Sequence, residues 1–400
     1  MTVPSEPGVP GFSASGVHCG VKANGLDLAL LVSDRPASVA GVFTRSTVVG
    51  APVALSRERV RGGSARAVVV NSGIANVAMG ARGRRDAVRM GGMVAQALKC
   101  PAREVLVAST GVIGEPLPMA AIGRGVGAAV KALDPLGLVR AAEAIRTTDT
   151  FAKWSVRRVR LGGRTVTVAG IAKGSGMIEP DMATMLGFLL TDADASSAYL
   201  RAVLRRVCDD TFNRVTVDGE TSTSDSVFLL AGGASQAPRL SRGAGGSGER
   251  FEQAVHSVAE SLAMDLARDG EGATKLIKVV VSGAHSDREA TRAARRVANS
   301  LLVKTAIFGS DPNWGRILQT VGAGRVRLKE ARTRIRLCGI TVFRAGASAG
   351  PAARRKAALR LVEADQVEIE VDLGAGAHAA RVWTCDLSTD YVRINAEYTT

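Results

Sequence analysis

The sequence predicts a protein of mixed α/β or α+β class with a sizeable core. Short β-rich runs alternate with helical patterns along most of the chain, which is typical of these classes. Four hundred residues, 46% of them hydrophobic, are enough for two domains or for one large α/β unit with a smaller one appended. No apolar run reaches the roughly 20 residues of a membrane span, and the start lacks the features of a signal peptide. We therefore expect a cytoplasmic protein without a membrane partner.

Two strand-and-helix units are predicted in the first third of the chain. They consist of a strand at residues 66–70, a turn at 71–73, a helix at 84–99, a second strand at 104–108 and a second helix at 119–133. Thr110 and Gly111 follow the second strand. Site residues often occupy the point where a strand meets a loop.

The next elements lead toward a glycine-rich segment. Gly162 and Gly163 separate two β-rich runs, residues 155–161 and 164–170, and so indicate a hairpin. Its second strand runs into Lys173. An apolar, strand-like run follows Thr184.

The rest of the chain is predicted to be mixed as well. The expected order is a mobile surface loop at 232–249, a helix at 251–268 ended by the glycines of 269–272, a strand at 275–282, a helix from 286 to about 300, a glycine-punctuated segment at 308–316, and a last stretch of hairpin, helix and strands. We place the start of a smaller C-terminal α/β region near residue 286.

The formal charge of +15 raises the question of a nucleic-acid partner. The arginines are scattered through predicted helices, for example at positions 82, 84, 85, 89, 201, 205, 206, 292, 295 and 296, and aromatic residues make up only 4%. Few aromatic rings are therefore available to stack on bases, and solvated helix faces explain the charge better. We expect no nucleic-acid partner, although a basic surface can attract small acidic substrates.

The cysteines and histidines predict neither a disulfide framework nor a metal site. The five cysteines (19, 100, 208, 338, 385) are widely spaced and never form a Cys-x-x-Cys pair. We expect reduced thiols, at least one of them a small buried hydrophobe. The four histidines (18, 256, 285, 378) show no metal-ligand spacing.

Three clusters combine glycines with groups that bind or move protons. The first runs from Lys173 to Thr184, where glycines allow unusual backbone angles and Pro180 restricts the turn. A threonine hydroxyl is a weak nucleophile that needs a base, and cleavage of the Ala183-Thr184 bond would supply one as a free α-amino group. The alternative is an ordinary turn before a strand.

The second cluster is Ser109 to Gly114, in which a hydroxyl and a backbone N–H are suited to form an oxyanion hole. The alternative is a simple turn at a strand end. The third cluster is Asp269 to Lys275, whose Glu271 can bind an amine or position a proton, unless it is merely solvated.

Taken together, these segments resemble the ornithine acetyltransferase (glutamate N-acetyltransferase) family of arginine biosynthesis. The self-cleavage segment of that family is similar to residues 173–186, Lys-Gly-Ser-Gly-Met-Ile-Glu-Pro-Asp-Met-Ala-Thr-Met-Leu. The other strong matches are residues 108–114, 147–150, 216–225, 269–275, 311–316 and 395–400, and looser matches lie at 42–44 and 51–53.

The resemblance implies roles for matching residues. Thr184 corresponds to the nucleophile that begins the second chain after cleavage at Ala183, and Thr110 and Gly111 to the oxyanion hole. The substrate-contacting positions correspond to Thr147, Lys173, Thr184, Glu271, Asn395 and Thr400. The lysine offers a cation for an α-carboxylate and the glutamate an anion for an ammonium group.

The resemblance also implies a fold and a reaction. The fold is a layered αββα sandwich, cut into an α chain of residues 1–183 and a β chain of residues 184–400 that assemble as a heterotetramer. Thr184 takes an acetyl group from N-acetylornithine, ornithine leaves, and glutamate accepts the acetyl group, with no cofactor. Acetyl-CoA is an alternative donor. A third possibility is hydrolysis, as in aminopeptidases that share the fold, although the matches at Lys173 and Glu271 favour a transferase. A non-enzymatic basic binding protein is the last alternative.

One departure from the family pattern lies at residues 71–80. Ile74 stands where the family usually has asparagine, and Met79 where it has threonine. The change predicts either a shifted acyl donor or acceptor, as in relatives that serve antibiotic pathways, or a neutral packing exchange.

Overall fold

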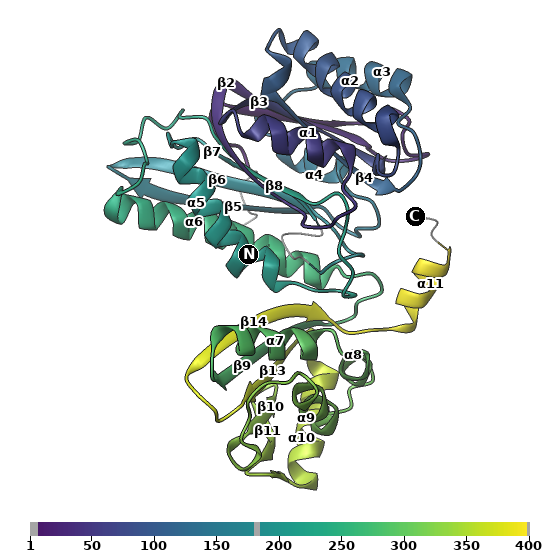
Figure 1. The fold of residues 1–400 in the computed structure, drawn as a ribbon, viewed down its shortest axis with the longest axis vertical. Coiled ribbons are helices and arrows are strands. Elements are labelled where there is room, and N and C mark those ends of the chain that lie inside the picture. The colour runs from purple at the N-terminus through teal and green to yellow at the C-terminus, as the bar shows by residue number, and fades with distance from the viewer. Residues whose placement is uncertain (1–6, 180–184, 398–400) are drawn as a thin grey trace. The chain divides into compact units, whose positions relative to one another are not determined.

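The computed structural model describes residues 7–179 and 185–397 and divides into two compact units (Figure 1). The first comprises the chain up to Asn213 together with Glu220–Leu262. The second comprises Arg214–Gly219 together with the chain from Ala263 onward. The second unit thus includes the strand at 276–284, ahead of the boundary near residue 286 that we expected from the sequence.

The first unit is built on an eight-stranded sheet. Its strands are β1 (Phe12–Val17), β2 (Leu28–Phe43), β3 (Ser64–Ile74), β4 (Val105–Val112), β5 (Lys153–Leu161), β6 (Arg164–Lys173), β7 (Leu186–Thr191) and β8 (Ser226–Ala231). The order is β4-β3-β2-β8-β7-β6-β5, with β1 paired to β2. The 16-residue β2 joins the two halves, because its first part pairs with β3 and its last six residues pair with β8.

The two halves of this sheet face each other across an apolar core, and helices cover their outer faces (Figure 1). The covering helices are α1 (Ala51–Val60), α2 (Gly80–Leu98), α3 (Met119–Lys131), α5 (Ser197–Asp210) and α6 (Gly245–Arg268). The short α4 (Leu138–Ala144) packs instead into the inner core, through residues such as Leu138 and Ala141. Inward residues such as Val68 and Leu31 share one core with Phe188 and Phe228. This arrangement confirms the predicted αββα layering.

Alternation along the strands decides which residues enter which layer. On β3, Val68 belongs to the inner core while Val69 packs outward under α2 and α3, because successive side chains point to opposite faces. On the other half, Gly170 of β6 leaves room for α6, since a Cβ there would lie 3.0 Å from Val258. Both faces of each half are therefore buried, as expected for strands with near-continuous apolar runs.

Most elements predicted from the sequence are present. The hairpin is β5–β6, with positive φ at Gly162 and Gly163, and helices α2, α3 and α6 lie where the apolar periodicity predicted them. The loop expected at 232–249 is shorter, because α6 begins at Gly245.

The predicted turn at Asn71–Gly73 is wrong. Strand β3 continues to Ile74 and β4 to Val112, in parallel register that pairs Ser72 with Thr110 and Gly73 with Gly111. Thr110 and Gly111 therefore lie inside a strand end and not in a loop. The polar and glycine residues that suggested a turn are accommodated because each strand end has a paired neighbour.

The second unit is a six-stranded sheet with the order β12-β11-β10-β13-β9-β14. The strands are β9 (Leu276–Ala284), β10 (Arg334–Leu337), β11 (Ile340–Arg344), β12 (Ala347–Ser348), β13 (Gln366–Asp372) and β14 (His378–Cys385). The helices are α7 (Asp287–Ala298), α8 (Leu301–Phe308), α9 (Trp314–Gly322), α10 (Pro351–Glu363) and α11 (Thr389–Glu397), with a short 3-10 helix at Glu330–Arg332. Two further 3-10 helices lie at Ala102–Glu104, in the first unit, and at Phe212–Arg214, where the chain passes from the first unit to the second. Alanines along one face of α7, including Ala290 and Ala294, pack closely onto this sheet.

Candidate active site

Lys173, at the end of β6, brings two of the predicted site threonines together. Its Nζ donates to Thr147 Oγ1 at 2.9 Å and to Thr110 Oγ1 at 3.3 Å. Lys173 and Thr110 are buried, with 8% and 9% of their surfaces exposed. The strand pairing sets Lys173 opposite Leu186, the second residue after Thr184. The structure thus assembles a cation and two hydroxyls at the end of the strands that lead to the proposed nucleophile.

The backbone around Gly111 leaves no room for a side chain. Gly111 has a φ of +129°, and a Cβ there would lie 2.2 Å from the carbonyl carbon of Gly73 on the neighbouring strand. Below this contact, Ser109 Oγ donates to Asn71 Oδ1 at 2.6 Å, and Asn71 Nδ2 donates to the Ile74 carbonyl at 2.8 Å. Side-chain hydrogen bonds between β3 and β4 therefore fix the strand end that carries Thr110 and Gly111.

Asp149 organises the loop between α4 and β5 that carries Thr147. Its Oδ2 accepts the Thr147 N–H at 3.0 Å, and its Oδ1 accepts the Gly174 N–H at 2.6 Å and Lys153 Nζ at 2.7 Å. Burial alone would raise the pKa of Asp149. The charges of Lys173 and Lys153, with these hydrogen bonds, hold that pKa below its ordinary value. The ionised carboxylate thus ties Thr147 to the residue that follows Lys173.

A second buried carboxylate, Asp27, shapes the loop next to this cluster. Its oxygens accept four consecutive backbone N–H groups, those of residues 19–22, at 2.6–3.0 Å. The loop presents Lys22, whose Nζ donates to the Arg146 carbonyl at 3.0 Å and whose pKa is lowered, mainly by burial. A Cβ on Gly73 would lie 2.9 Å from Lys22 Cγ, so Lys22 lies directly over the strand end beside Gly111. The sequence carried no signal for Lys22.

Asp225 is a buried carboxyl that is hydrogen bonded to the chain just before β7, at Met185. Burial raises its pKa well above the ordinary value, against hydrogen bonds from the Ser222 side chain and the Met185 N–H. The Thr44 N–H donates to the Asp225 carbonyl oxygen at 3.1 Å. Among the described residues, Asp225 Oδ2 has no hydrogen-bond partner. Asp225 and Asp149 both lie within matched sequence blocks, yet only the fold reveals that both are buried.

Glu271 and Asn395, predicted from distant parts of the chain, meet within the second unit. Asn395 Nδ2, on α11, donates to Glu271 Oε2 at 2.8 Å and to the Tyr391 carbonyl at 3.0 Å. Gly272, with a φ of +70°, lets α11 approach, since a Cβ there would lie 2.5 Å from the Tyr391 nitrogen. The carboxylate stays partly exposed in the loop that follows α6.

Three predicted site residues, Ala183, Thr184 and Thr400, lie outside the described residues. Their roles remain predictions.

The two departures from the family pattern occupy different environments. Ile74 is buried and packs in the core under α2 and α3, while Met79 is partly exposed at the start of α2. The strand end that carries Ile74 does border the cluster, through the contact of Gly73 with Gly111. The Ile74 side chain packs among apolar residues, which favours the packing exchange over altered specificity.

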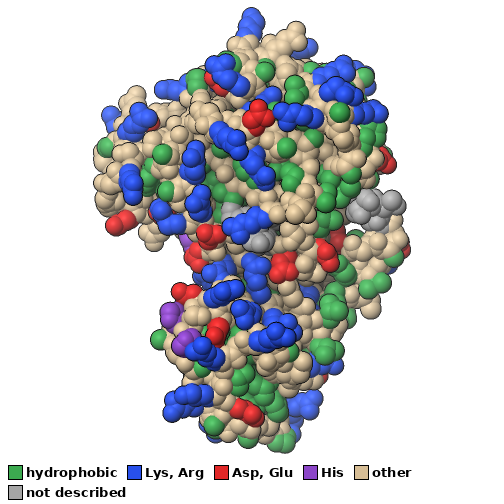
Figure 2. Space-filling view, in the orientation of Figure 1, with side chains coloured by type: hydrophobic (Ala, Val, Ile, Leu, Met, Phe, Trp, Pro, Cys, Tyr) green, Lys and Arg blue, Asp and Glu red, His purple; other side chains and the backbone are tan. Residues whose placement is uncertain are grey.

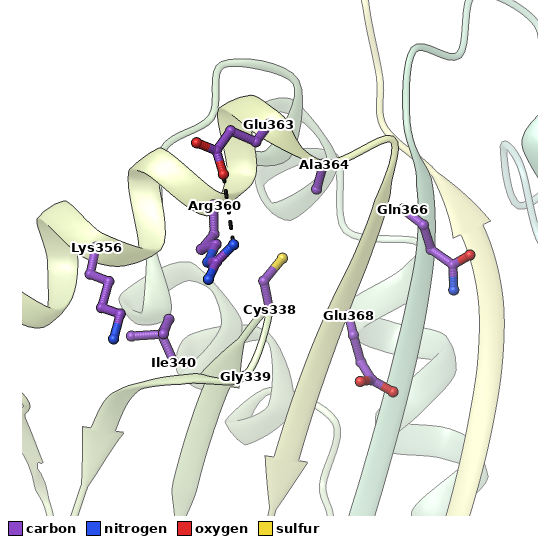
Figure 3. Close-up of a pocket in the computed structure, with 9 residues that line it drawn as sticks. All are labelled: Cys338, Gly339, Ile340, Lys356, Arg360, Glu363, Ala364, Gln366 and Glu368. Atoms are coloured by element: carbon purple, nitrogen blue, oxygen red, sulfur yellow. Dashed lines mark ion pairs between the residues drawn. The ribbon is translucent and has the colours of Figure 1, made fainter.

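None of the five cysteines is among the predicted site residues. Cys208 and Cys385 are buried and all five cysteines are unpaired, so the prediction of a buried, hydrophobe-like cysteine is confirmed. A cavity of about 510 Å³ in the second unit is lined by Cys338, Lys356, Arg360 and Glu368 among others, with Arg360 paired to Glu363 (Figure 3). It contains none of the predicted site residues.

Basic side chains are spread over the visible face of the molecule, among fewer acidic ones (Figure 2). Arg201 and Arg205 are exposed, as predicted for arginines on solvated helix faces, but they are not isolated. With Arg45, Arg57 and Arg61 they line an open groove of about 780 Å³, here named the arginine groove, whose other lining residues are Gly41, Val42, Phe43, Thr44, Ser46 and Val60.

In the part of the chain that the structure describes, no helix is long and apolar enough to cross a membrane. Nor does any group of three or more His, Cys, Asp or Glu side chains within residues 7–179 and 185–397 have the arrangement of a metal site.

Comparisons with known proteins agree over nearly the whole chain. Residues 13–400 match the ArgJ family. Arginine biosynthesis bifunctional protein ArgJ of Symbiobacterium thermophilum is 47% identical, covering 98% of this chain and 97% of the relative. The protein of the same name from Geobacter sulfurreducens is also 47% identical, with 98% and 100% covered.

A solved structure is similar as well. The crystal structure of arginine biosynthesis bifunctional protein ArgJ from Bacillus halodurans is 41% identical, covers 53% of this chain and 98% of its own, and superposes with a TM-score of 0.51. Since the family match and the relatives extend over almost all of its length, this chain belongs to the ArgJ family.

Proposed function

We propose that this chain is a self-processing acetyltransferase that cleaves its Ala183-Thr184 bond and then transfers acetyl from N-acetylornithine to glutamate through an ester on Thr184. The supporting observation is the cluster of Lys173, Thr110 and Thr147. The β6–β7 pairing sets this cluster opposite the second residue after Thr184.

In the cleavage step, the Thr184 hydroxyl oxygen attacks the Ala183 carbonyl carbon. The C–N bond breaks and an ester forms in its place. The nitrogen takes up the hydroxyl proton and becomes a free α-amino group. Water then hydrolyses the ester and separates the two chains.

In the transfer steps, Thr184 attacks the acetyl carbonyl of N-acetylornithine. The C–N bond breaks, ornithine leaves with the proton removed from the hydroxyl, and the amine of glutamate later displaces Thr184 from the acetyl ester. The acetyl group is carried by the chain itself, so this chemistry needs no cofactor.

Thr110 and Gly111 are suited to stabilise the oxyanion in both reactions. Because Thr110 Oγ1 accepts a hydrogen bond from Lys173, its own hydroxyl proton can point elsewhere and is polarised by the nearby cation. We assign substrate-carboxylate binding to Lys173, substrate-ammonium binding to Glu271, and further substrate contacts to Thr147, Asn395 and Thr400.

The freed α-amino group must be neutral to act as a base. A cation nearby disfavours protonation of an amine, and Lys173 supplies one. Asp225, whose carboxyl accepts the Met185 N–H one residue beyond Thr184, has its pKa raised by burial, which disfavours the opposing negative charge.

The size of the solved relative's chain supports the two-chain product. At 98% of its own length that chain spans 53% of this one, about the share that residues 184–400 represent. We expect the two chains to stay together as a cytoplasmic heterotetramer, which the mass of the native complex would test.

Mass spectrometry of the purified protein tests the cleavage. Wild type should give fragments of 183 and 217 residues, whereas Thr184→Ala should stay intact and lose acetyl transfer. Thr305→Ala, which changes an exposed threonine of α8, is the control and should be cleaved normally. Full transfer by an intact chain would refute the nucleophile assignment.

Labelled acetyl donors distinguish the alternatives. Labelled N-acetylornithine or acetyl-CoA is supplied as the acetyl donor, and glutamate or water is the acceptor. Acetylglutamate formed from N-acetylornithine supports the proposal. Formation from acetyl-CoA adds a synthase activity, and release of free acetate alone would indicate a hydrolase.

A further inference from the structure

The arginine groove lies where β2 ends between α1 and α5. Arg57 of α1 and Arg61, which caps the C-terminus of that helix, are spaced i, i+4, and Arg201 and Arg205 have the same spacing on α5. Residues with this spacing lie on one face of a helix. Two helices that are far apart in the sequence thus each contribute a pair of arginine side chains to the lining of the same groove.

The groove is lined by cations without anions. No Asp or Glu is among its lining residues, all of which are described. Two glutamates of the neighbouring helices are engaged elsewhere: Glu58 Oε2 lies 3.2 Å from Arg84 Nη2, and Glu252 accepts two hydrogen bonds at 2.7 Å from Arg206. Like charges spaced i, i+4 destabilise a helix by about 0.2–0.5 kcal/mol per pair, so an anion in the groove would relieve a standing repulsion.

The size and charge of the groove suit a ligand larger than a single amino-acid carboxylate. A cavity of about 780 Å³ lies within the roughly 300–1,000 Å³ of sites for drug-sized ligands and cofactors. One carboxylate needs one guanidinium group, whereas several phosphate groups match several arginines through paired N–H···O bonds.

The groove offers little to a nucleic-acid base. Its aromatic residue, Phe43, packs edge-on against Phe228, and the Arg57 guanidinium covers its ring at 5.5 Å from the centroid. The Arg57 side chain also donates to the Thr44 carbonyl at 2.8 Å and is thereby fixed. Without a free stacking surface, recognition rests on the phosphate groups.

The groove is connected to the candidate active site through strand register. Phe43 pairs with Ser226, Ser226 with Leu186, and Leu186 with Lys173. Three strand spacings of about 4.8 Å put the backbone of Phe43 roughly 14 Å from that of Lys173. The lining residue Thr44 also donates its N–H to the Asp225 carbonyl oxygen at 3.1 Å.

We propose that the arginine groove binds a small anion that carries two or more phosphate groups, such as the diphosphate part of ADP or coenzyme A. A ligand roughly 14 Å from Lys173 is either an extended, phosphorylated acyl donor or an effector of the reaction. This link to acetyl transfer rests on the proposed function. The binding itself is independent of the proposed function, since Thr184 is not part of the groove.

Titration calorimetry of the wild-type protein at low salt tests the binding with ADP, coenzyme A, pyrophosphate, glutamate and a 20-nucleotide single-stranded DNA. ADP and coenzyme A should bind, glutamate should not, and raising the salt concentration should weaken binding. The double variant Arg201→Gln/Arg205→Gln should weaken ADP binding at least tenfold.

The matched control is Arg85→Gln/Arg89→Gln. It removes an exposed i, i+4 arginine pair from α2, outside the groove, and should bind ADP as wild type does. Equal loss in both double variants, or no binding of any phosphate compound by wild type, would overturn the proposal. So would DNA that binds more tightly than ADP and displaces it.

Assays of wild type then separate the two sources of such a ligand. If glutamate is acetylated from acetyl-CoA and ADP inhibits competitively with acetyl-CoA, the ligand is a donor. If acetyl-CoA gives no product but ADP changes the KM for N-acetylornithine, the ligand is an effector. The Thr184→Ala variant should lose acetyl transfer but retain ADP binding, so the proposed function and the binding by the groove are tested separately.

Discussion

Lys153 and Asp149 form an ion pair inside the first unit, with Nζ and Oδ1 2.7 Å apart and both side chains fully buried. The same carboxylate accepts the backbone N–H groups of Thr147 and Gly174. A pair buried this deeply is stabilising only while both charges are present and hydrogen bonded. It therefore couples the stability of the first unit to the placement of Thr147 beside Lys173.

Asp149→Asn should destabilise the protein strongly. It leaves Lys153 charged and buried without its partner, which costs about 3–5 kcal/mol in comparable cases. The depressed pKa of Asp149 contributes stability that is present above its unfolded value near 3.8 and is lost as the pH falls from there through the folded pKa. Denaturant unfolding at about pH 7 and about pH 2.5 should therefore show a large difference between variant and wild type that shrinks in acid. An equal difference at both values would contradict this.

Gly111→Ala should abolish most activity. The added Cβ would overlap the Gly73 carbonyl carbon, so the strand end with its proposed oxyanion donors must shift. Losing one such donor typically reduces kcat by about 100-fold or more. Gly114→Ala is the control, because Gly114 also has a positive φ, of +85°, but no described atom lies within 4 Å of its Cβ position. Similar kcat values for the two variants, measured with labelled N-acetylornithine, would count against the role of Gly111.

Lys173→Met should impair substrate binding and transfer together. It removes the ammonium group that donates hydrogen bonds to Thr110 and Thr147. The same group is the proposed partner of the substrate carboxylate. We expect kcat/KM to fall about 100-fold or more, since a charged hydrogen bond and a preorganised donor are both lost. Lys173→Arg should recover part of the KM. Unchanged steady-state kinetics in Lys173→Met would exclude the assignment.

Asp225→Asn should stabilise the protein at neutral pH. The folded state keeps this carboxyl protonated to a higher pH than the unfolded chain does, so stability falls as the pH rises from about 3.8 through the raised pKa. An uncharged asparagine removes that penalty. Melting temperatures from pH 3 to pH 8 should be higher for the variant at neutral pH and converge in acid. A lower melting temperature at pH 7 would show that the charged form is stabilised instead.

Ile74→Asn should reduce stability without changing the preferred acyl donor. The Ile74 side chain is buried among apolar residues, where an amide without a partner costs about 1–3 kcal/mol. Ile74→Val should cost only about 0.5–1.5 kcal/mol. Comparing N-acetylornithine with other N-acetylated amino acids as donors for both variants measures the preference. A changed ranking in Ile74→Asn would support the alternative that this position sets specificity.

Local sequence patterns were sufficient for much of the fold. Apolar periodicity predicted α2, α3 and α6, and Gly162-Gly163 predicted the β5–β6 hairpin, because these elements depend on residues close together in the chain. The same local reasoning failed at Asn71–Gly73. There the polar side chains and the glycine are held in strand conformation by β4, which lies about 40 residues further along.

The sequence alone identified the residues that carry the resemblance, including Thr110, Lys173 and Thr184, because motif residues keep their order and spacing in the chain. Only the tertiary structure joined Lys173 to Thr110 and Thr147, revealed that Asp149, Lys153 and Asp225 are buried, and gathered the arginines of two helices into one groove. These properties depend on which distant segments pack together, and a pKa or an ion pair exists only once burial and neighbouring charges are set. The order of residues along the chain specifies neither the burial of a group nor the charges that surround it.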